Sequence, residues 1–364
     1  PGTYTIEVQE FTPAPYGCAG EVQQLEIFVY DVPTAWAGDD VVICAGESVT
    51  LGGNAASGGS SATGGSGSFS YSWNPSFGLD NASLEHPEAS PGNTRTFTLT
   101  VTDLLSGCAP ETDDVTVTVN TVTGGTISSD QTLCEGENPA VLTSSTDPTG
   151  SGTLTYDWEE STDNINWTSL GVTGLTYDPP QPVQTMYYKR VAYSDMGGKV
   201  CSAESNVVEI TFNSADPGSI GTDDIICSGD DPVLLTSLDD GSTAGVVNYQ
   251  WQTSADGINF SDIGGANFST YDPPPQAVTT YYRRKILSTL NFVTCEAFSN
   301  IVEITINDLT HGTIVNDQTI CVGGNPGIIG STDDGTTSGG ISSYSWESSV
   351  DGINFSTIDR KSVV

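Results

Sequence analysis

Basic residues are scarce in this sequence of 364 residues. Lys and Arg number 9 against 46 Asp and Glu, so the formal net charge is −37. Such a surface repels nucleic acids and anionic membranes, and we expect neither as a partner. No apolar run reaches the length of a membrane span, and no leader opens the sequence, which starts at Pro1. We therefore interpret the chain as an internal fragment without a membrane-spanning helix.

Histidine and known catalytic motifs are scarce as well. The two histidines, His86 and His311, lie far apart, and the sequence has neither a GxSxG motif nor a phosphate-binding loop. A zinc site would need clustered cysteines and histidines, which the sequence lacks, so we expect no zinc site. A carboxylate pair for glycoside hydrolysis is compatible with the composition, but repeated units rarely each hold a solitary active site. We expect no enzymatic activity and no cofactor.

Periodic helical segments rich in Leu, Lys and Glu are also lacking. Ser, Thr, Gly, Asn and Val dominate, which favours short strands joined by turns. One unit then recurs: a Tyr-x-Trp strand, then Asp-Gly or Asp-Asn, then a second strand with Ile and an aromatic residue. Close copies begin at Tyr156, Tyr249 and Tyr344, and a diverged copy begins at Tyr71. Because Asp-Gly favours tight turns with positive φ, each close copy predicts a β-hairpin.

These copies divide the sequence into repeats. We interpret residues 1–31 as the C-terminal strands of a truncated preceding repeat. Complete repeats follow at residues 32–120, 121–213 and 214–307, named here the first, second and third repeats, and residues 308–364 form the N-terminal half of a truncated fourth repeat. A Gly/Ser-rich insertion at residues 52–67 predicts a mobile loop. The sequence predicts an all-β chain of seven-stranded antiparallel sandwiches in an extended rod, each repeat adding roughly 35 to 40 Å.

The last six residues, 359–364, break the repeat pattern abruptly. Their codons can match a common sequencing adapter. We therefore hypothesise that this hexapeptide is adapter read-through and not protein.

Eight cysteines recur with a fixed short spacing. Neighbours 26 positions apart are Cys18 and Cys44, Cys108 and Cys134, Cys201 and Cys227, and Cys295 and Cys321. An extended segment of that length spans roughly 80 Å, whereas a disulfide permits only ~6 Å between Cα atoms. We therefore expect bonds within repeats, which join Cys44 to Cys108, Cys134 to Cys201, and Cys227 to Cys295. Disulfides indicate an oxidising, exported setting.

Motifs over nearly the whole chain carry a family resemblance. The first repeat, with Cys44–Gly46, Tyr71–Pro75 and Gly107-Cys108, resembles the PKD-like domains of large bacterial surface proteins. The later repeats, with YxW, DGIN, Thr280–Arg284 and Ser299–Val302, resemble the immunoglobulin-like repeats that accompany them. The resemblance implies tandem β-sandwiches in secreted adhesins of gliding bacteria, exported by type IX secretion. It also implies an extracellular location or attachment to the outer membrane.

Tryptophans are candidates for the core or for stacking on sugars. One Trp per repeat in the same strand is what a sandwich core requires, so we assign this role to Trp73, Trp158, Trp251 and Trp346. Trp36 has no counterpart at the other boundaries between repeats, and we expect it to pack between domains.

Basic residues fall on one predicted strand of successive repeats: Arg95, Lys189, Arg190, Arg283, Arg284 and Lys285. A basic stripe would suit an acidic glycan. Acids on the neighbouring strand, such as Glu159 and Glu160, favour cross-strand ion pairs instead.

Acidic pairs near the joints are weak candidates for Ca²⁺ ligands: Asp223, Asp224, Asp230 and Asp231. No EF-hand loop or nonapeptide calcium repeat is present, so solvated turns are the default interpretation and we assign no metal site.

The repeats together favour a non-catalytic stalk or spacer of an adhesin that mediates cell-surface adhesion or gliding. The alternatives are a glycan-binding array and an accessory region of a secreted polysaccharide hydrolase. Expected partners are neighbouring repeats of the same chain, and surface polysaccharide or another cell-surface protein.

Overall fold

The computed structural model describes residues 1–53, 59–338 and 342–358, and every regular element in these ranges is a β-strand. The predicted all-β class is therefore confirmed. These ranges contain no helix long and apolar enough to cross a membrane. The read-through hypothesis concerns residues 359–364, which lie outside the described residues.

The chain divides into two compact units, which are described separately. The first comprises Pro1–Gln131, Ala140–Pro180 and Thr185–Ile210, and the second comprises Thr132–Pro139, Gln181–Gln184 and Thr211–Val364.

Strands of the first 120 residues are β1 (Gly2–Phe11), β2 (Ala19–Val29), β3 (Thr34–Ala35), β4 (Val41–Cys44), β5 (Val49–Thr50), β6 (Ala62–Thr63), β7 (Phe69–Asn74), β8 (Glu88–Ala89), β9 (Arg95–Asp103) and β10 (Glu111–Asn120). Strands of the second repeat are β11 (Val122–Thr123), β12 (Thr126–Ile127), β13 (Gln131–Cys134), β14 (Ser144–Thr146), β15 (Thr149–Gly150), β16 (Thr153–Ser161), β17 (Thr168–Ser169), β18 (Met186–Met196), β19 (Lys199–Glu204) and β20 (Val208–Asn213).

Strands of the third repeat are β21 (Ala215–Asp216), β22 (Ser219–Ile220), β23 (Asp224–Cys227), β24 (Ser237–Asp239), β25 (Ser242–Thr243), β26 (Val246–Ser254), β27 (Ser261–Asp262), β28 (Thr280–Leu290), β29 (Val293–Phe298) and β30 (Val302–Asn307). Strands after Asn307 are β31 (Leu309–Thr310), β32 (Thr313–Val315), β33 (Gly330–Asp333), β34 (Thr336–Thr337), β35 (Glu347–Ser348) and β36 (Ser356–Thr357).

In the first unit, the main sheet of the first repeat has the order β4-β10-β9-β7. β4 runs parallel to β10, so that Val41 lies opposite Val117 and Cys44 opposite Asn120. β9 and β10 alternate apolar and polar residues, because one face of the sheet packs on the core and the other faces solvent. The insertion is partly integrated into this repeat, since β6 pairs with β3 and Ala62 is buried. The predicted mobility therefore does not extend to β6, and residues 54–58 lie outside the described residues.

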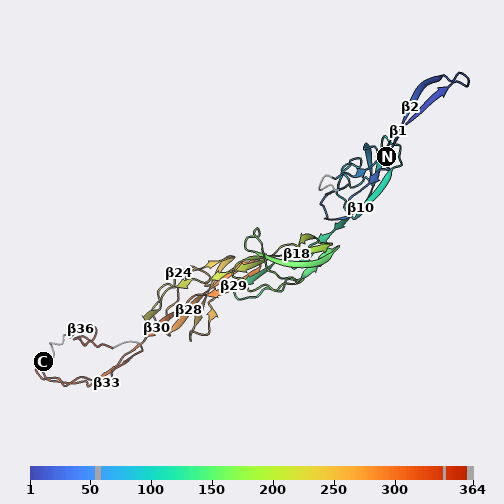
Figure 1. Ribbon diagram of the computed structural model, residues 1–364. Coiled ribbons are helices and arrows are strands. Elements are labelled where there is room, and N and C mark those ends of the chain that lie inside the picture. The colour runs from blue at the N-terminus through green and yellow to red at the C-terminus, as the bar shows by residue number, and fades with distance from the viewer. Residues whose placement is uncertain (54–58, 339–341, 359–364) are drawn as a thin grey trace. The chain divides into compact units, whose positions relative to one another are not determined.

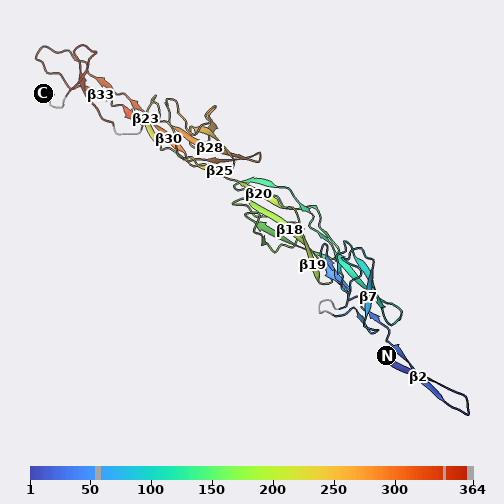
Figure 2. The same cartoon turned by 90° about the horizontal axis from the view of Figure 1, so that it is seen from above.

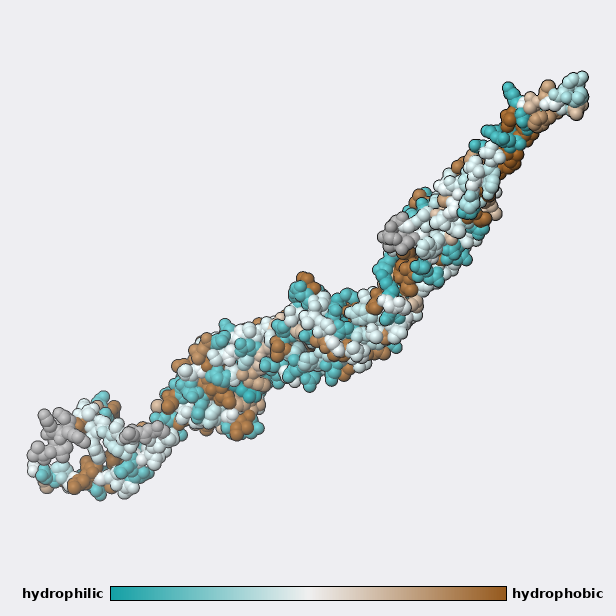
Figure 3. All heavy atoms as spheres, viewed as in Figure 1, coloured by the Kyte–Doolittle hydropathy of each residue, from teal (hydrophilic) through white to brown (hydrophobic). Residues whose placement is uncertain are grey.

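The hairpin of β1 and β2 precedes this sandwich. Its residues are exposed, and apolar side chains lie along it (Figure 3). A two-stranded ribbon has no second layer against which to bury them.

The second repeat is built around the long strand β18. β16 pairs with one edge of β18, and β19 and β20 pair with the other. Trp158 on β16 is fully buried, and its ring lies 5.7 Å from that of Tyr177, which lies 5.6 Å from that of Tyr188.

In the second unit, the third repeat has the sheet order β23-β30-β28-β26-β27, with β29 also pairing with β28. β28, β29 and β30 are labelled in Figure 1. β23 lies parallel to β30, and the two strands are labelled side by side in Figure 2. A bridge between Leu235 and Tyr271 belongs to the opposite layer. An early strand parallel to the closing strand, with hairpin-linked central strands, is the arrangement of an immunoglobulin-like sandwich. Its core consists of Ile220, Leu235, Trp251, Ala266, Tyr282, Val302 and Ile304.

The turn after the Tyr-x-Trp strand is longer than the sequence predicts. Gly257 has the expected positive φ of 69°, but β27 starts only at Ser261, after the Ile and aromatic positions. Asp256 organises this turn, since one carboxylate oxygen accepts the N–H groups of Ile258 and Asn259. The turn is therefore a side-chain-capped loop rather than a two-residue hairpin.

Candidate functional site

The described part of the chain contains two disulfides, and neither lies within one repeat. Cys44 bonds Cys201 in the first unit, with 5.6 Å between their Cα atoms, and Cys134 bonds Cys295 in the second, with 5.4 Å. Each bond joins an early strand of one repeat to a hairpin of the next repeat. This hairpin is β18-β19 for Cys201 and β28-β29 for Cys295. The predicted pairs Cys44–Cys108, Cys134–Cys201 and Cys227–Cys295 are therefore wrong. Cysteines without a bond in the described part of the chain are Cys18, Cys108, Cys227 and Cys321.

Strand direction explains this correction. Because β4 is parallel to β10, Cys44 lies opposite Asn120, where the closing strand ends. Cys108 lies before β10 begins, in the connection between β9 and β10 at the other end of that strand. β10 is 10 residues long, so roughly 30 Å separates its two ends. A disulfide permits only about 6 Å between Cα atoms, so Cys44 and Cys108 are too far apart to form a bond.

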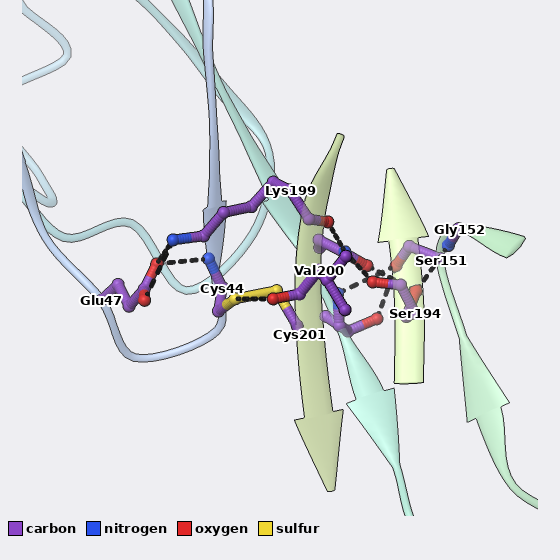
Figure 4. The surroundings of a disulfide bond; sticks show 10 residues. Cys44, Glu47, Ser151, Gly152, Ser194, Lys199, Val200 and Cys201 are labelled. Carbon is purple, nitrogen blue, oxygen red and sulfur yellow. Dashed lines mark hydrogen bonds and ion pairs between the residues drawn. A yellow bond between two sulfur atoms is a disulfide. The ribbon is translucent and has the colours of Figure 1, made fainter. Parts of the chain in front are cut away.

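A charged pair accompanies the Cys44–Cys201 bond (Figure 4). The Lys199 ammonium lies 2.8 Å from the Glu47 carboxylate, which also accepts the N–H of Cys44 at 2.9 Å. The hydrogen bond from Lys199, followed by that from Cys44, lowers the pKa of Glu47. The carboxylate therefore stays ionised and holds the turn after Cys44 against the partner hairpin.

An asparagine and a serine form the buried part of the same joint. Asn120 Nδ2 donates to the carbonyl oxygens of Ser194 and Lys199, at 2.7 and 3.1 Å. The Ser194 hydroxyl donates back to Asn120 Oδ1 at 2.7 Å and accepts the N–H of Gly152. Both Asn120 and Ser194 are fully buried. Their hydrogen bonds fix the position of the hairpin that carries Cys201.

The second unit repeats this arrangement with different residues. Asn213 Nδ2 donates to the carbonyl oxygens of Ser288 and Val293, at 2.9 and 3.0 Å, and the Ser288 hydroxyl donates to Asn213 Oδ1. Gly245 N–H donates to Ser288 at 3.0 Å. In both joints the serine lies directly opposite the bonded cysteine on the hairpin. We name this set of asparagine, serine and disulfide the joint.

Three of the four candidate core tryptophans are buried. Trp73, Trp158 and Trp251 are at most 2% exposed, and each indole N–H donates to a backbone carbonyl. Trp346 is 50% exposed and differs from the expectation. The strands after β34 in the described fourth repeat are two-residue pieces, and no counterpart of β28 or β30 covers this ring there.

The basic residues follow the predicted strand but divide into two kinds. Lys189 pairs with Glu159 at 3.3 Å and Glu204 at 2.7 Å, as cross-strand pairing predicts. Arg190 and Arg284 are instead fully buried, whereas cross-strand pairing predicted them on the sheet surface. The Arg284 guanidinium donates to four acceptors: the Ser237 hydroxyl and the carbonyl oxygens of Ser269, Pro217 and Asp239.

The weak calcium candidates are engaged in local hydrogen bonds or exposed. Asp223 accepts the N–H of Glu303 at 2.8 Å, and Asp224 accepts that of Ile225. Asp230 and Asp231 lie in an exposed irregular segment after β23. Among the residues that the structure describes, no group of three or more His, Cys, Asp and Glu could hold a metal ion.

Trp36 lies on a shallow groove of about 270 Å³ in the first unit. Its side chain is 47% exposed, and the groove continues along Gly38, Asp39, Asp40 and Thr50. An aromatic face beside carboxylates and backbone polar groups is a surface on which a sugar ring can stack.

One protein-family model, described as "Domain of unknown function (DUF8696)", matches residues 123–214, 216–308 and 310–363. These matches together cover well over half of the chain. No curated protein matches it.

Solved structures of multidomain chains are similar at low identity. The N-terminal eight immunoglobulin domains of Down Syndrome Cell Adhesion Molecule are 12% identical, with a TM-score of 0.43 over 84% of this chain and 40% of that one. Three N-terminal domains of the bacteriophage RB49 outer capsid protein Hoc are 13% identical, with a TM-score of 0.34 over 76% and 99%. Drosophila N-cadherin EC1-4 is 9% identical, with a TM-score of 0.28 over 84% and 83%. Likeness at this level carries no information about function.

Proposed function

We propose that this chain, which belongs to the DUF8696 family, is a non-catalytic spacer segment of a secreted or cell-surface adhesin. The observation that supports this most is the disulfide at each of two successive joints. A covalent bond between neighbouring repeats keeps them together under tension, as a segment between a cell and its attachment point requires. Disulfides also persist in oxidising compartments, which supports an extracellular location.

The finer parts of the proposal rest on the resemblance of the repeat motifs. According to these parts, the protein is a bacterial adhesin that is exported by type IX secretion, attached to the outer membrane and active in adhesion or gliding. The proposed domains are residues 32–120, 121–213 and 214–307, arranged as a rod, between partial repeats at 1–31 and 308–364. Its proposed partners are adjoining repeats and a surface polysaccharide or protein.

Single-molecule pulling tests the spacer function. With both disulfides intact, only the stretch 134–201 can extend between Cys44 and Cys295, so a reductant should lengthen the chain released from this region several-fold. Equal steps in both conditions would contradict a role in bearing tension. Variants that retain one disulfide at a time assign each change to its joint.

A glycan-binding array is the second candidate, and the exposed Trp36 beside its groove favours it. A spacer should bind no member of a glycan array more tightly than millimolar. Micromolar binding that Trp36→Ala abolishes would support the second candidate instead. Arg283→Ala is the companion variant, because this base lies between the rings of Phe260 and Phe298, at 4.2 and 4.0 Å.

A further inference from the structure

The third repeat carries, in Cys227 and Asn307, the same pair of cysteine and asparagine that the first repeat contributes to its joint. Cys44 lies opposite Asn120 on the parallel strands β4 and β10, and the following hairpin supplies the second cysteine. The parallel strands β23 and β30 place Cys227 opposite Asn307 in the same way. Cys227 is exposed and, within the described residues, has no bonded partner.

Asn307 gives independent evidence of a missing partner. Asn120 and Asn213 each accept a serine hydroxyl through Oδ1. Asn307 Oδ1 is buried, yet it has no hydrogen-bond partner among the residues that the structure describes. A buried polar atom without a partner is costly, and the two other joints show which group satisfies it.

We propose that Cys227 and Asn307 form an acceptor site for the cysteine-bearing β-hairpin of a further repeat of the same family. The hairpin must carry a serine directly opposite its cysteine, as Ser288 lies opposite Cys295. The serine hydroxyl donates to Asn307 Oδ1, and the hairpin cysteine bonds Cys227. Two thiols then lose two protons and two electrons to a disulfide oxidant such as oxidised glutathione, which becomes two thiols.

An extended chain tests this site. Residues 1–309 are fused to a copy of residues 216–307, which places the copied Cys295 after Cys227 at a spacing close to the 157 and 161 residues of the two observed bonds. After oxidation with a glutathione redox pair, peptide mapping without reductant should find Cys227 linked to the copied Cys295. Alkylation of Cys227 in the native state should fall at least tenfold relative to the original chain.

Variants separate docking from simple thiol proximity. Asn307→Ala in the extended chain should lower the yield of the bond about tenfold at limiting oxidised glutathione, whereas the exposed Asn248→Ala should leave it unchanged. A second extension with a copy of residues 123–213, which carries Cys201, covers a failure of the first added repeat to fold. The proposal is overturned if Cys227 stays reactive, or takes up glutathione instead, beside a folded added repeat.

Discussion

Replacing both Cys44 and Cys201 by serine removes the covalent link of the first unit with little change in side-chain size. The bond closes a loop of 157 residues. By the loop-entropy estimate, such a closure contributes roughly 5 kcal/mol to the free energy of unfolding, and residual structure in the unfolded chain lowers that figure. We expect the double variant to lose about 3 to 5 kcal/mol, which corresponds to a fall in Tm of roughly 10 °C for a unit of this size.

The assay is guanidinium unfolding followed by tryptophan fluorescence, together with calorimetry. A matched control replaces Cys108 and Cys227, which have no disulfide in the described residues. This control should change the free energy of unfolding by no more than about 0.5 kcal/mol, because it removes no bond. Reductant should lower the stability of the wild-type chain further than that of the double variant, which retains only the bond between Cys134 and Cys295. An unchanged unfolding midpoint in the double variant, or an equal loss in the control, would refute the reasoning.

Three further predictions concern single side chains. Arg284→Ala removes the donor of four hydrogen bonds in the core of the third repeat and should cost about 3 kcal/mol or more in urea unfolding, whereas Arg283→Ala should cost about 1 kcal/mol; equal costs would contradict the assigned burial. Hydrogen bonds to the Asp256 carboxylate, first of all from the N–H of Asn259, lower the pKa of Asp256. The carboxylate therefore contributes fully to stability above the unfolded pKa of about 4, and this contribution is lost as the pH falls below that value. Asp256→Asn should therefore reduce the fall of Tm below about pH 4. Lys199→Ala breaks an exposed ion pair and should shift Tm by no more than about 2 °C, a difference that 1 M salt should erase.

The fold class and the strand positions could be predicted because they depend on the pattern of neighbouring residues in the sequence. Alternation of apolar and polar residues identifies β9, β10 and β28. The Tyr-x-Trp strand places one buried indole in each of the three complete repeats. The buried arginines were within reach of the same reasoning. Trp251 lies opposite Arg284 in the sheet, so both side chains share the inward face, while Arg283 points the other way. The register between β26 and β28 therefore determines that Arg284, and not Arg283, is buried.

The disulfide pairing could not be derived from spacing alone. It depends on whether the strand that carries Cys44 runs parallel or antiparallel to the closing strand, which sequence patterns do not show. One signal was available: each complete repeat closes on an asparagine, at Asn120, Asn213 and Asn307. An amide that recurs at a strand end indicates a contact beyond that strand.

The two disulfides also determine how the chain responds to proteolysis. Cys44 and Cys201 form one covalent branch point, and Cys134 and Cys295 form another. Three stretches of backbone connect these branch points: residues 44–134, 134–201 and 201–295. A protease that cuts any one of them leaves the two branch points joined through the other two. Separation of Cys44 from Cys295 needs a cut in every stretch, so these two cysteines stay covalently connected after one or even two cleavages in different stretches.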